Sequence, residues 1–196
     1  LEIKTFESHK GEDYNGMDSY ATHLDYIWPE LRIGALTISA QEKPISSTAA
    51  MQHTVDTSSM YSSWPQKVEE DLAGIKLALA RKDFMTLGQI VENNTLAMHI
   101  LMNSAQPPIT YALPQTIEAI SRVQELRLAN IPVFFTQDAG PNLQLLFLAQ
   151  HEPMVLHVFP ELDVVMPFAD SNAEQVILVN EKDVDVGTCE KLAAHI

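Results

Sequence analysis

Two β-rich runs that lie close together in the chain constrain the fold more than any other feature. Residues 131–136 and 143–148 are dominated by aliphatic and aromatic side chains that favour strands. Turn-forming residues from Gln137 to Pro141 lie between them, and Gly140 is available for a positive φ. A connection of this length is typical of a β-hairpin, so the sequence predicts two antiparallel strands with Asp138 where they join.

The residues before this hairpin carry helix signals. Helices are predicted to begin at Ser46-Ser47-Thr48, at Ser63-Trp64-Pro65-Gln66, which has capping-box spacing, and at Pro114. An apolar repeat over 87–101 predicts another helix, which ends before Pro107 and Pro108.

Further strands are predicted at 31–38, 163–166 and 175–180, with a short helix at 152–162. Helices and mostly antiparallel strands in this order predict an α+β fold, a two-layer sandwich of helices on the sheet. The polar stretch 1–28 is interpreted as a connector or the tail of a missing N-terminal domain, and 29–196 as the folded domain. Because the chain begins with Leu1, we expect part of the protein to precede it.

Charge and cysteine content exclude several classes of partner. The chain has 12 Lys and Arg against 26 Asp and Glu, a formal net charge of −14. Such an acidic surface repels phosphate backbones and anionic lipids, so neither nucleic acid nor a membrane is expected as a partner. Cys189 is the only cysteine, which fits a reducing compartment, and no apolar run is long enough to span a bilayer. A cytoplasmic protein is therefore expected.

Asp138 is the leading candidate for chemistry. A carboxylate held at the end of a strand has a fixed geometry and can act as a general base or position a hydroxyl. Spacing alone favours the alternative that Asp138 caps its own turn, while Gly140 and Pro141 shape the loop.

A second candidate is Ser46-Ser47-Thr48. At the start of a helix, hydroxyls and free N–H groups can bind a phosphate or carboxylate, although the same residues are also ordinary N-caps. Asn94 and His99 lie on one predicted helix and are interpreted as structural, since His99 has no second ligand at metal-binding spacing. No glycine-rich nucleotide loop is present, so no residue is assigned to a cofactor and no metal site is expected.

Several stretches resemble one family when they are taken together and in order. They are Trp28-Pro29-Glu30-Leu31-Arg32, the run from Ser46-Ser47-Thr48 to Ser58, Asp83-Phe84, Asn94 with Met98-His99, Gln106-Pro107-Pro108-Ile109-Thr110-Tyr111, and Phe135-Thr136-Gln137-Asp138-Ala139-Gly140-Pro141-Asn142. This set is similar to the carboxy-terminal half of the diphosphomevalonate decarboxylases, in the GHMP kinase superfamily. The chain departs from the pattern at Ala50, where the motif usually has glycine.

The resemblance implies a ferredoxin-like GHMP kinase C-terminal domain and an enzyme that uses ATP and Mg²⁺. Its substrate is mevalonate 5-diphosphate, which it converts to isopentenyl diphosphate, CO2, ADP and phosphate. Asp138 matches the catalytic aspartate that orients or deprotonates the 3-hydroxyl, and Ser47 and Thr48 match substrate-contacting positions. A homodimer is also implied.

The family's phosphate loop and several substrate-binding residues would precede Leu1. Of the cations in this chain, only Lys43 lies near Ser47 in the sequence and none adjoins Asp138. Counter-charge must then come from Mg²⁺ and from the missing half, so the fragment alone is expected to be inactive. A phosphomevalonate decarboxylase, a mevalonate 3-kinase and a non-catalytic folding or dimerisation module remain as alternatives.

Overall fold

The computed structural model describes residues 26–168, 175–179 and 185–190. Residues 30–166 form one compact unit, and the final pair of strands belongs to a second unit. Most of the predicted connector 1–28 lies outside the described residues. The unit 30–166 contains every candidate site residue.

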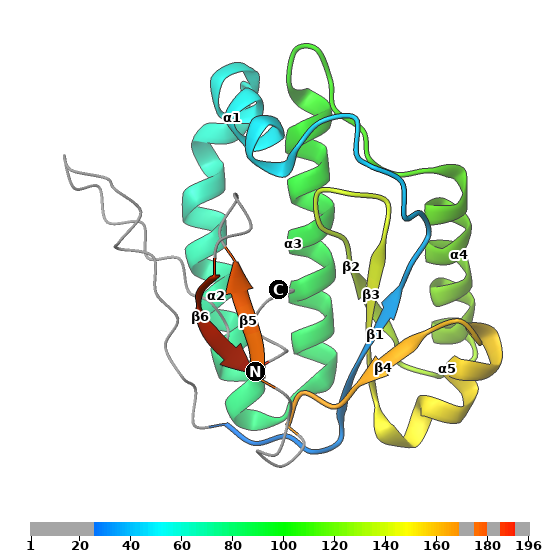
Figure 1. The fold of residues 1–196 in the computed structure, drawn as a ribbon. Helices are drawn as coiled ribbons and strands as arrows, with labels where there is room; N and C mark the ends of the chain where they lie inside the picture. The colour runs from blue at the N-terminus through cyan, green and yellow to red at the C-terminus, as the bar shows by residue number, and fades with distance from the viewer. Residues whose placement is uncertain (1–25, 169–174, 180–184, 191–196) are drawn as a thin grey trace. The chain divides into compact units, whose positions relative to one another are not determined.

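A four-stranded sheet organises this unit. It consists of β1 (Leu31–Leu36), β2 (Phe134–Thr136), β3 (Leu143–Leu148) and β4 (Asp163–Val165), in the order β2-β3-β1-β4 (Figure 1). All neighbouring strands are antiparallel. The predicted hairpin is the β2–β3 pair, in which Phe135 lies opposite Leu145.

Five α-helices connect and cover these strands. They are α1 (Ser47–Thr57), α2 (Trp64–Arg81), α3 (Phe84–Ser104), α4 (Pro114–Leu128) and α5 (Glu152–Val158), with short 3-10 turns η1 (Tyr61–Ser63) and η2 (Ala149–His151). With α4 before β2 and α5 between β3 and β4, the order and pairing of the strands give the βαββαβ arrangement of a ferredoxin-like fold. The predicted α+β class is confirmed, and α1 to α3 form a helical insertion between β1 and α4.

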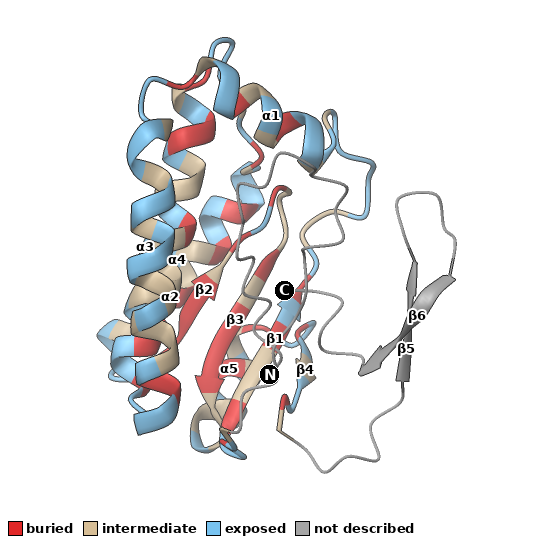
Figure 2. Ribbon diagram, turned by 90° about the vertical axis from the view of Figure 1, so that its left-hand side faces the viewer, coloured by how far each residue is buried: buried red, intermediate tan, exposed pale blue. Residues whose placement is uncertain are grey.

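The main core lies between one face of the sheet and helices α4 and α5. Side chains alternate along each strand, so Phe135, Leu145 and Phe147 all point to this face and are almost fully buried. Helix α4 contributes a buried stripe in which Ala119, Val123 and Leu126 recur at helical spacing. Figure 2 shows buried residues along the strands and on the inner sides of the helices.

Helix α3 packs on the opposite side of β2. The ring of Phe134 meets Phe84 edge-on, with the ring centroids 5.6 Å apart. At Gly88 a Cβ atom would collide with the Phe134 ring, so glycine is what allows α3 to approach the strand this closely. Figure 1 shows α3 and α4 on either side of the strands.

A partly buried ion pair joins α3, α4 and β2. Arg127 binds both carboxylate oxygens of Glu92, at 2.6 and 3.0 Å. Glu92 also accepts the backbone N–H of Phe135 at 3.3 Å, and β2 is the edge strand of the sheet that the described residues form. The guanidinium of Arg127 lies 5.2 Å from the centroid of Phe134. These contacts fix the strand that leads directly to Asp138.

Several sequence predictions differ from the structure. Strand β2 begins at Phe134 rather than at residue 131, because Pro132 has no N–H to donate to a sheet. The predicted capping box at Ser63 is wrong: η1 places Ser63 in helical backbone, and its hydroxyl donates to the carbonyl of Met60 instead. Gly140 does not adopt a positive φ; its N–H donates to the carbonyl of Asp138 at 2.8 Å in a three-residue turn, and the side chain of Gln137 donates to its carbonyl.

The second unit contains an antiparallel pair, β5 (Gln175–Val179) and β6 (Asp185–Glu190). Strand β5 was predicted from the sequence. Strand β6 was missed, because its acidic residues and Gly187 have low strand propensity and only pairing with β5 identifies it.

Candidate functional site

Asp138 follows β2 directly and is exposed between two buried neighbours. Gln137 is 4% exposed and Ala139 is 9% exposed, so the chain on either side of Asp138 is anchored in the protein. This arrangement presents one carboxylate from a fixed backbone, which is the geometry required for a residue that must meet a substrate in one orientation.

Helix α3 holds the first half of the turn. The hydroxyl of Thr95 accepts the backbone N–H of Gln137 at 3.3 Å and lies 2.7 Å from the hydroxyl of Thr136. One helical turn later, Nε2 of His99 lies 3.2 Å from the carbonyl oxygen of Gln137. Both backbone groups of the residue before Asp138 are therefore bound by side chains of one helix.

Helix α4 and the first residues after β1 hold the second half. The amide of Gln137 donates to the carbonyl of Gly140 at 2.7 Å, and Thr116, which is fully buried, donates to the carbonyl of Pro141 at 2.8 Å. The side-chain oxygen of Asn142 accepts the backbone N–H groups of Ile38 and Ser39. Sequence reasoning missed these supports; a polar Thr116 on the apolar stripe of α4 was the one available signal.

Burial sets the protonation of His99. Desolvation lowers the pKa of His99 below its ordinary value, although hydrogen bonds to the backbone of Gln137 and Asp138 and the nearby Asp138 charge act in the opposite direction. Burial therefore favours the neutral form of the ring. The interpretation of His99 as a residue with a satisfied hydrogen bond agrees with this geometry.

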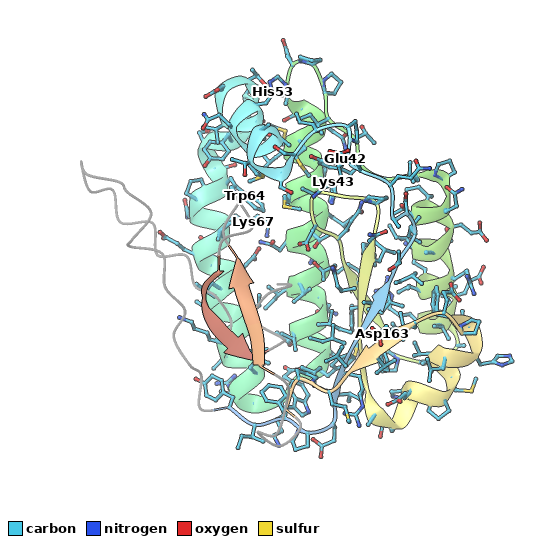
Figure 3. The ribbon with its side chains drawn as sticks, in the orientation of Figure 1. Glu42, Lys43, His53, Trp64, Lys67 and Asp163 are labelled. Carbon is cyan, nitrogen blue, oxygen red and sulfur yellow. The ribbon has the colours of Figure 1, made fainter. Side chains whose placement is uncertain are left out.

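A pocket of about 350 Å³ opens beside the turn. Its lining includes Asp138 and the turn that carries it, residues 39–41 and 43 of the loop after β1, and Gln144 of β3. Lys43 brings a positive charge to this pocket, although no cation adjoins Asp138 in the sequence (Figure 3). The Oε1 atom of Gln144 is buried and has no hydrogen-bond partner in the part of the chain that the structure describes.

Lys43 also connects the pocket to the start of α1. Its Nζ atom lies 3.0 Å from the hydroxyl of Ser47, the first residue of that helix. The neighbouring Ser46 is the N-cap, as predicted, and accepts the N–H of Ala49 at 3.2 Å. Thr48 is exposed and does not line the pocket, so the structure brings Ser47 towards Asp138 through Lys43 but leaves Thr48 outside.

A small apolar cluster sets the position of α1 relative to the turn. Ala50, Met102, Tyr111 and Ala139 are buried together, and Ala50 is completely inaccessible. The methyl group of Ala50, which stands where the family motif usually has glycine, is thus a packing contact. The hydroxyl of Tyr111 donates to the carbonyl of Ile45 at 3.1 Å, and burial raises the pKa of Tyr111. This cluster fixes the separation between Ser47 and Asp138.

Asn94 is remote from this chemistry. Its amide donates to the carboxylate of Asp71 on α2 at 2.8 Å, and Asp71 also pairs with Lys67 at 2.7 Å. The residue is half-buried and joins α2 to α3. Its predicted structural role agrees with these contacts.

The described residues do not form a metal centre. Among them, no three His, Cys, Asp or Glu side chains gather as ligands. Asp138 supplies the one carboxylate among the described residues that line the pocket. Within the same ranges, no helix has the length and apolar character needed to cross a membrane.

Comparisons with known proteins agree with this architecture. Residues 35–193 match the family described as the mevalonate 5-diphosphate decarboxylase C-terminal domain. The diphosphomevalonate decarboxylase of Schizosaccharomyces pombe is 33% identical over 157 residues, which are 75% of this chain and 39% of that protein. The Danio rerio enzyme is 31% identical over 76% of this chain and 40% of its own length.

Solved structures show the same likeness. A structure of MDDEF in complex with MVAPP, AMPPCP and magnesium is 37% identical, with a TM-score of 0.66 over 69% of this chain and 43% of that one. Mevalonate diphosphate decarboxylase from Staphylococcus aureus is 30% identical, with a TM-score of 0.69 over 74% of this chain and 46% of that one. The chain spans about 40% of the length of the curated relatives that it matches. It therefore belongs to the mevalonate 5-diphosphate decarboxylase family and carries the C-terminal domain of that family.

Proposed function

We propose that this chain contributes Asp138 and the pocket that it lines to an active site. That site uses ATP to decarboxylate mevalonate 5-diphosphate and gives isopentenyl diphosphate. The observation that carries the proposal is the exposed carboxylate of Asp138, which lines a pocket with Lys43 while its neighbours are buried and hydrogen-bonded. Membership of the decarboxylase family supports the assignment of this carboxylate to the reaction.

Asp138 acts on the 3-hydroxyl of the substrate. A carboxylate within hydrogen-bond reach orients this tertiary hydroxyl and accepts its proton as the oxygen becomes phosphorylated. Rigid placement is most of what phosphoryl transfer asks of the protein, because the reaction depends on alignment and charge neutralisation. The hydrogen bonds from α3 and α4 to the turn supply that rigidity.

Lys43, Ser47 and Thr48 are assigned to the charged ends of the substrates. Lys43 is a cation in a chain of net charge −14, and its bond to Ser47 leaves further N–H donors for a phosphate or carboxylate. Because Thr48 is exposed, it can contact a substrate only if the ligand, or another part of the protein, extends over the start of α1.

MgATP supplies the phosphoryl group that makes the 3-oxygen a leaving group. One lysine in the described pocket does not balance a nucleotide triphosphate and a diphosphate. We therefore assign most of the phosphate contacts to an amino-terminal half of the same polypeptide. We also assign the assembly to a cytoplasmic homodimer, which sedimentation of the complete polypeptide tests.

The experiment that tests the function compares three substrates on the complete polypeptide. Mevalonate 5-diphosphate, mevalonate 5-phosphate and mevalonate are each supplied with MgATP, and CO2 and ADP are measured. We expect CO2 only from the diphosphate. Preferred release from the monophosphate indicates a phosphomevalonate decarboxylase, and ADP without CO2 from mevalonate indicates a 3-kinase; either result contradicts the proposal.

The isolated chain provides a second test. We expect no CO2 release and no ATP binding by calorimetry from residues 1–196 alone, and recovery of both in the complete polypeptide. Tight Mg²⁺-dependent binding of ATP to the isolated chain contradicts the assignment of the phosphate contacts to another half.

A further inference from the structure

His99 occupies a position from which it controls the direction of the Asp138 side chain. We propose that His99 is a positioning residue: its Nε2–H group holds the Gln137 carbonyl and so fixes the peptide plane that leads into Asp138. This inference rests on the proposed function for its kinetic consequence, and on the geometry of the turn for the contact itself.

The hydrogen bond selects one form of the imidazole ring. A carbonyl oxygen can only accept, so the nitrogen 3.2 Å from it must carry a hydrogen. Burial lowers the pKa of His99 and so favours the neutral ring, in which the one ring hydrogen must then be on Nε2. The contact thus requires the neutral Nε2–H tautomer.

The bonded carbonyl belongs to the peptide group between Gln137 and Asp138. That group is planar, so fixing the direction of its carbonyl also fixes the direction of the Asp138 N–H and limits rotation before the Asp138 Cα. Thr95, one turn earlier on α3, fixes the preceding peptide group through the Gln137 N–H. Gln137 is 4% exposed, so water is a poor substitute for either partner.

The chain contains a matched histidine that lacks this connection. His53 on α1 is also half-buried, and its Nε2 lies 2.8 Å from the carbonyl of Pro107. It makes the same kind of bond to a backbone carbonyl without contacting the Asp138 turn. A comparison of variants that lack the ring N–H of His99 or of His53 therefore distinguishes two effects. One is the loss of any histidine–carbonyl bond, and the other is the loss of control over Asp138.

The kinetic test uses three variants of the complete polypeptide. In His99→Phe we expect kcat for CO2 release to fall about 10- to 100-fold, because a small misplacement of a catalytic group costs this much. The KM for ATP should stay within about twofold of the wild type, since His99 does not line the pocket beside Asp138. His99→Gln carries an amide N–H at a similar reach and should recover most of kcat, whereas His53→Phe should leave kcat within about twofold.

Three outcomes overturn the proposal. One is a folded His99→Phe protein with wild-type kcat. Another is a loss in His99→Gln as large as that in His99→Phe, and the third is an equal loss in His53→Phe. Melting temperatures measured on the same samples, with rates taken per folded protein, exclude simple unfolding as the cause of a lower kcat.

A spectroscopic measurement is independent of both folding of the variants and activity. In the unsubstituted protein, the imidazole ¹⁵N shifts of His99 should show a protonated Nε2 and an unprotonated Nδ1 at pH 7. A protonated Nδ1 alone contradicts the contact. Failure of the wild type to release CO2 overturns the proposed function but leaves this assignment of the His99 contact testable.

Discussion

Two regions reach the same pocket with very different support. The turn that carries Asp138 is bonded to α3, to α4 and to the first residues after β1, and buried residues flank it on both sides. The loop that carries Lys43 is exposed from residue 41 to residue 44, and Lys43 itself is bonded to the hydroxyl of Ser47 at the start of α1.

This difference separates a chemical role from a binding role. A group that must meet one hydroxyl in one direction benefits from a backbone with no freedom. A cation that gathers phosphates benefits from a flexible side chain on an exposed loop, because it can follow its ligand into place. The comparison predicts that changes at the turn lower kcat, while changes at the loop mainly raise KM.

Asp138→Ala should have the largest effect. We expect CO2 release by the complete polypeptide to fall by orders of magnitude, about 100-fold or more, because a general base is removed. The melting temperature should change little, since the side chain is exposed. Asp163→Ala, an exposed aspartate on β4, is the control. A mild rate effect with a large drop in melting temperature would show that Asp138 only caps its turn.

Lys43→Met should have the next largest effect, which should fall on substrate binding. A hydrogen bond to a charged group contributes about 1.5–3 kcal/mol, which corresponds to roughly 10- to 100-fold in kcat/KM. We expect most of this in KM for the substrates. Lys67→Met is the matched control, because Lys67 is paired with Asp71 on α2. Equal losses in the two variants contradict a specific role for Lys43.

Thr116→Val tests, through the free energy of unfolding, whether α4 supports the turn that carries Asp138. The substitution preserves shape but leaves the Pro141 carbonyl and the Leu113 N–H without their partner. We expect the free energy of unfolding to fall by about 1–3 kcal/mol in urea titrations, with kcat falling as well. Ser121→Ala, on the exposed side of α4, should change stability by less than about 0.5 kcal/mol. An unchanged free energy of unfolding in Thr116→Val would show that α4 does not support the turn.

Ser46→Ala should have the smallest effect, and that effect should be confined to the start of α1, next to the exposed loop that carries Lys43. Loss of the N-cap costs about 1 kcal/mol, so amide hydrogens at the start of α1 should exchange about fivefold faster. Exchange in α4 should not change. Ser47→Ala should leave exchange in α1 near the wild-type rate and raise KM instead, which distinguishes the cap from the binding position.

Local signals explain what the sequence predicted well. The apolar runs gave the β2–β3 hairpin, and the hydroxyl and proline signals gave the starts of α1 and α4 within the residues proposed. Asp138 was singled out because turn residues follow a strand there, and its catalytic role was assigned only through the family resemblance. The failed capping box at Ser63 shows the limit of such signals, since the preceding turn η1 controls the backbone there.

The support of the site was not predictable in the same way. Asn142 bonds to Ile38 across 104 residues of sequence, and Arg32 bonds to Glu152 across 120. Lys43 joins the Asp138 pocket only because the sheet places the end of β1 beside β3. Such contacts depend on the assembled fold, and no spacing in the sequence indicates them.

The most direct test of the central claim compares Asp138→Asn with the wild type by turnover and melting temperature. Asparagine can cap a turn as aspartate does, but it is neither a base nor a charge. The account predicts that the Asn variant of the complete polypeptide melts within a few degrees of the wild type yet releases CO2 from mevalonate 5-diphosphate at least about 100-fold more slowly. Turnover near the wild-type rate in that variant would contradict a catalytic role for Asp138.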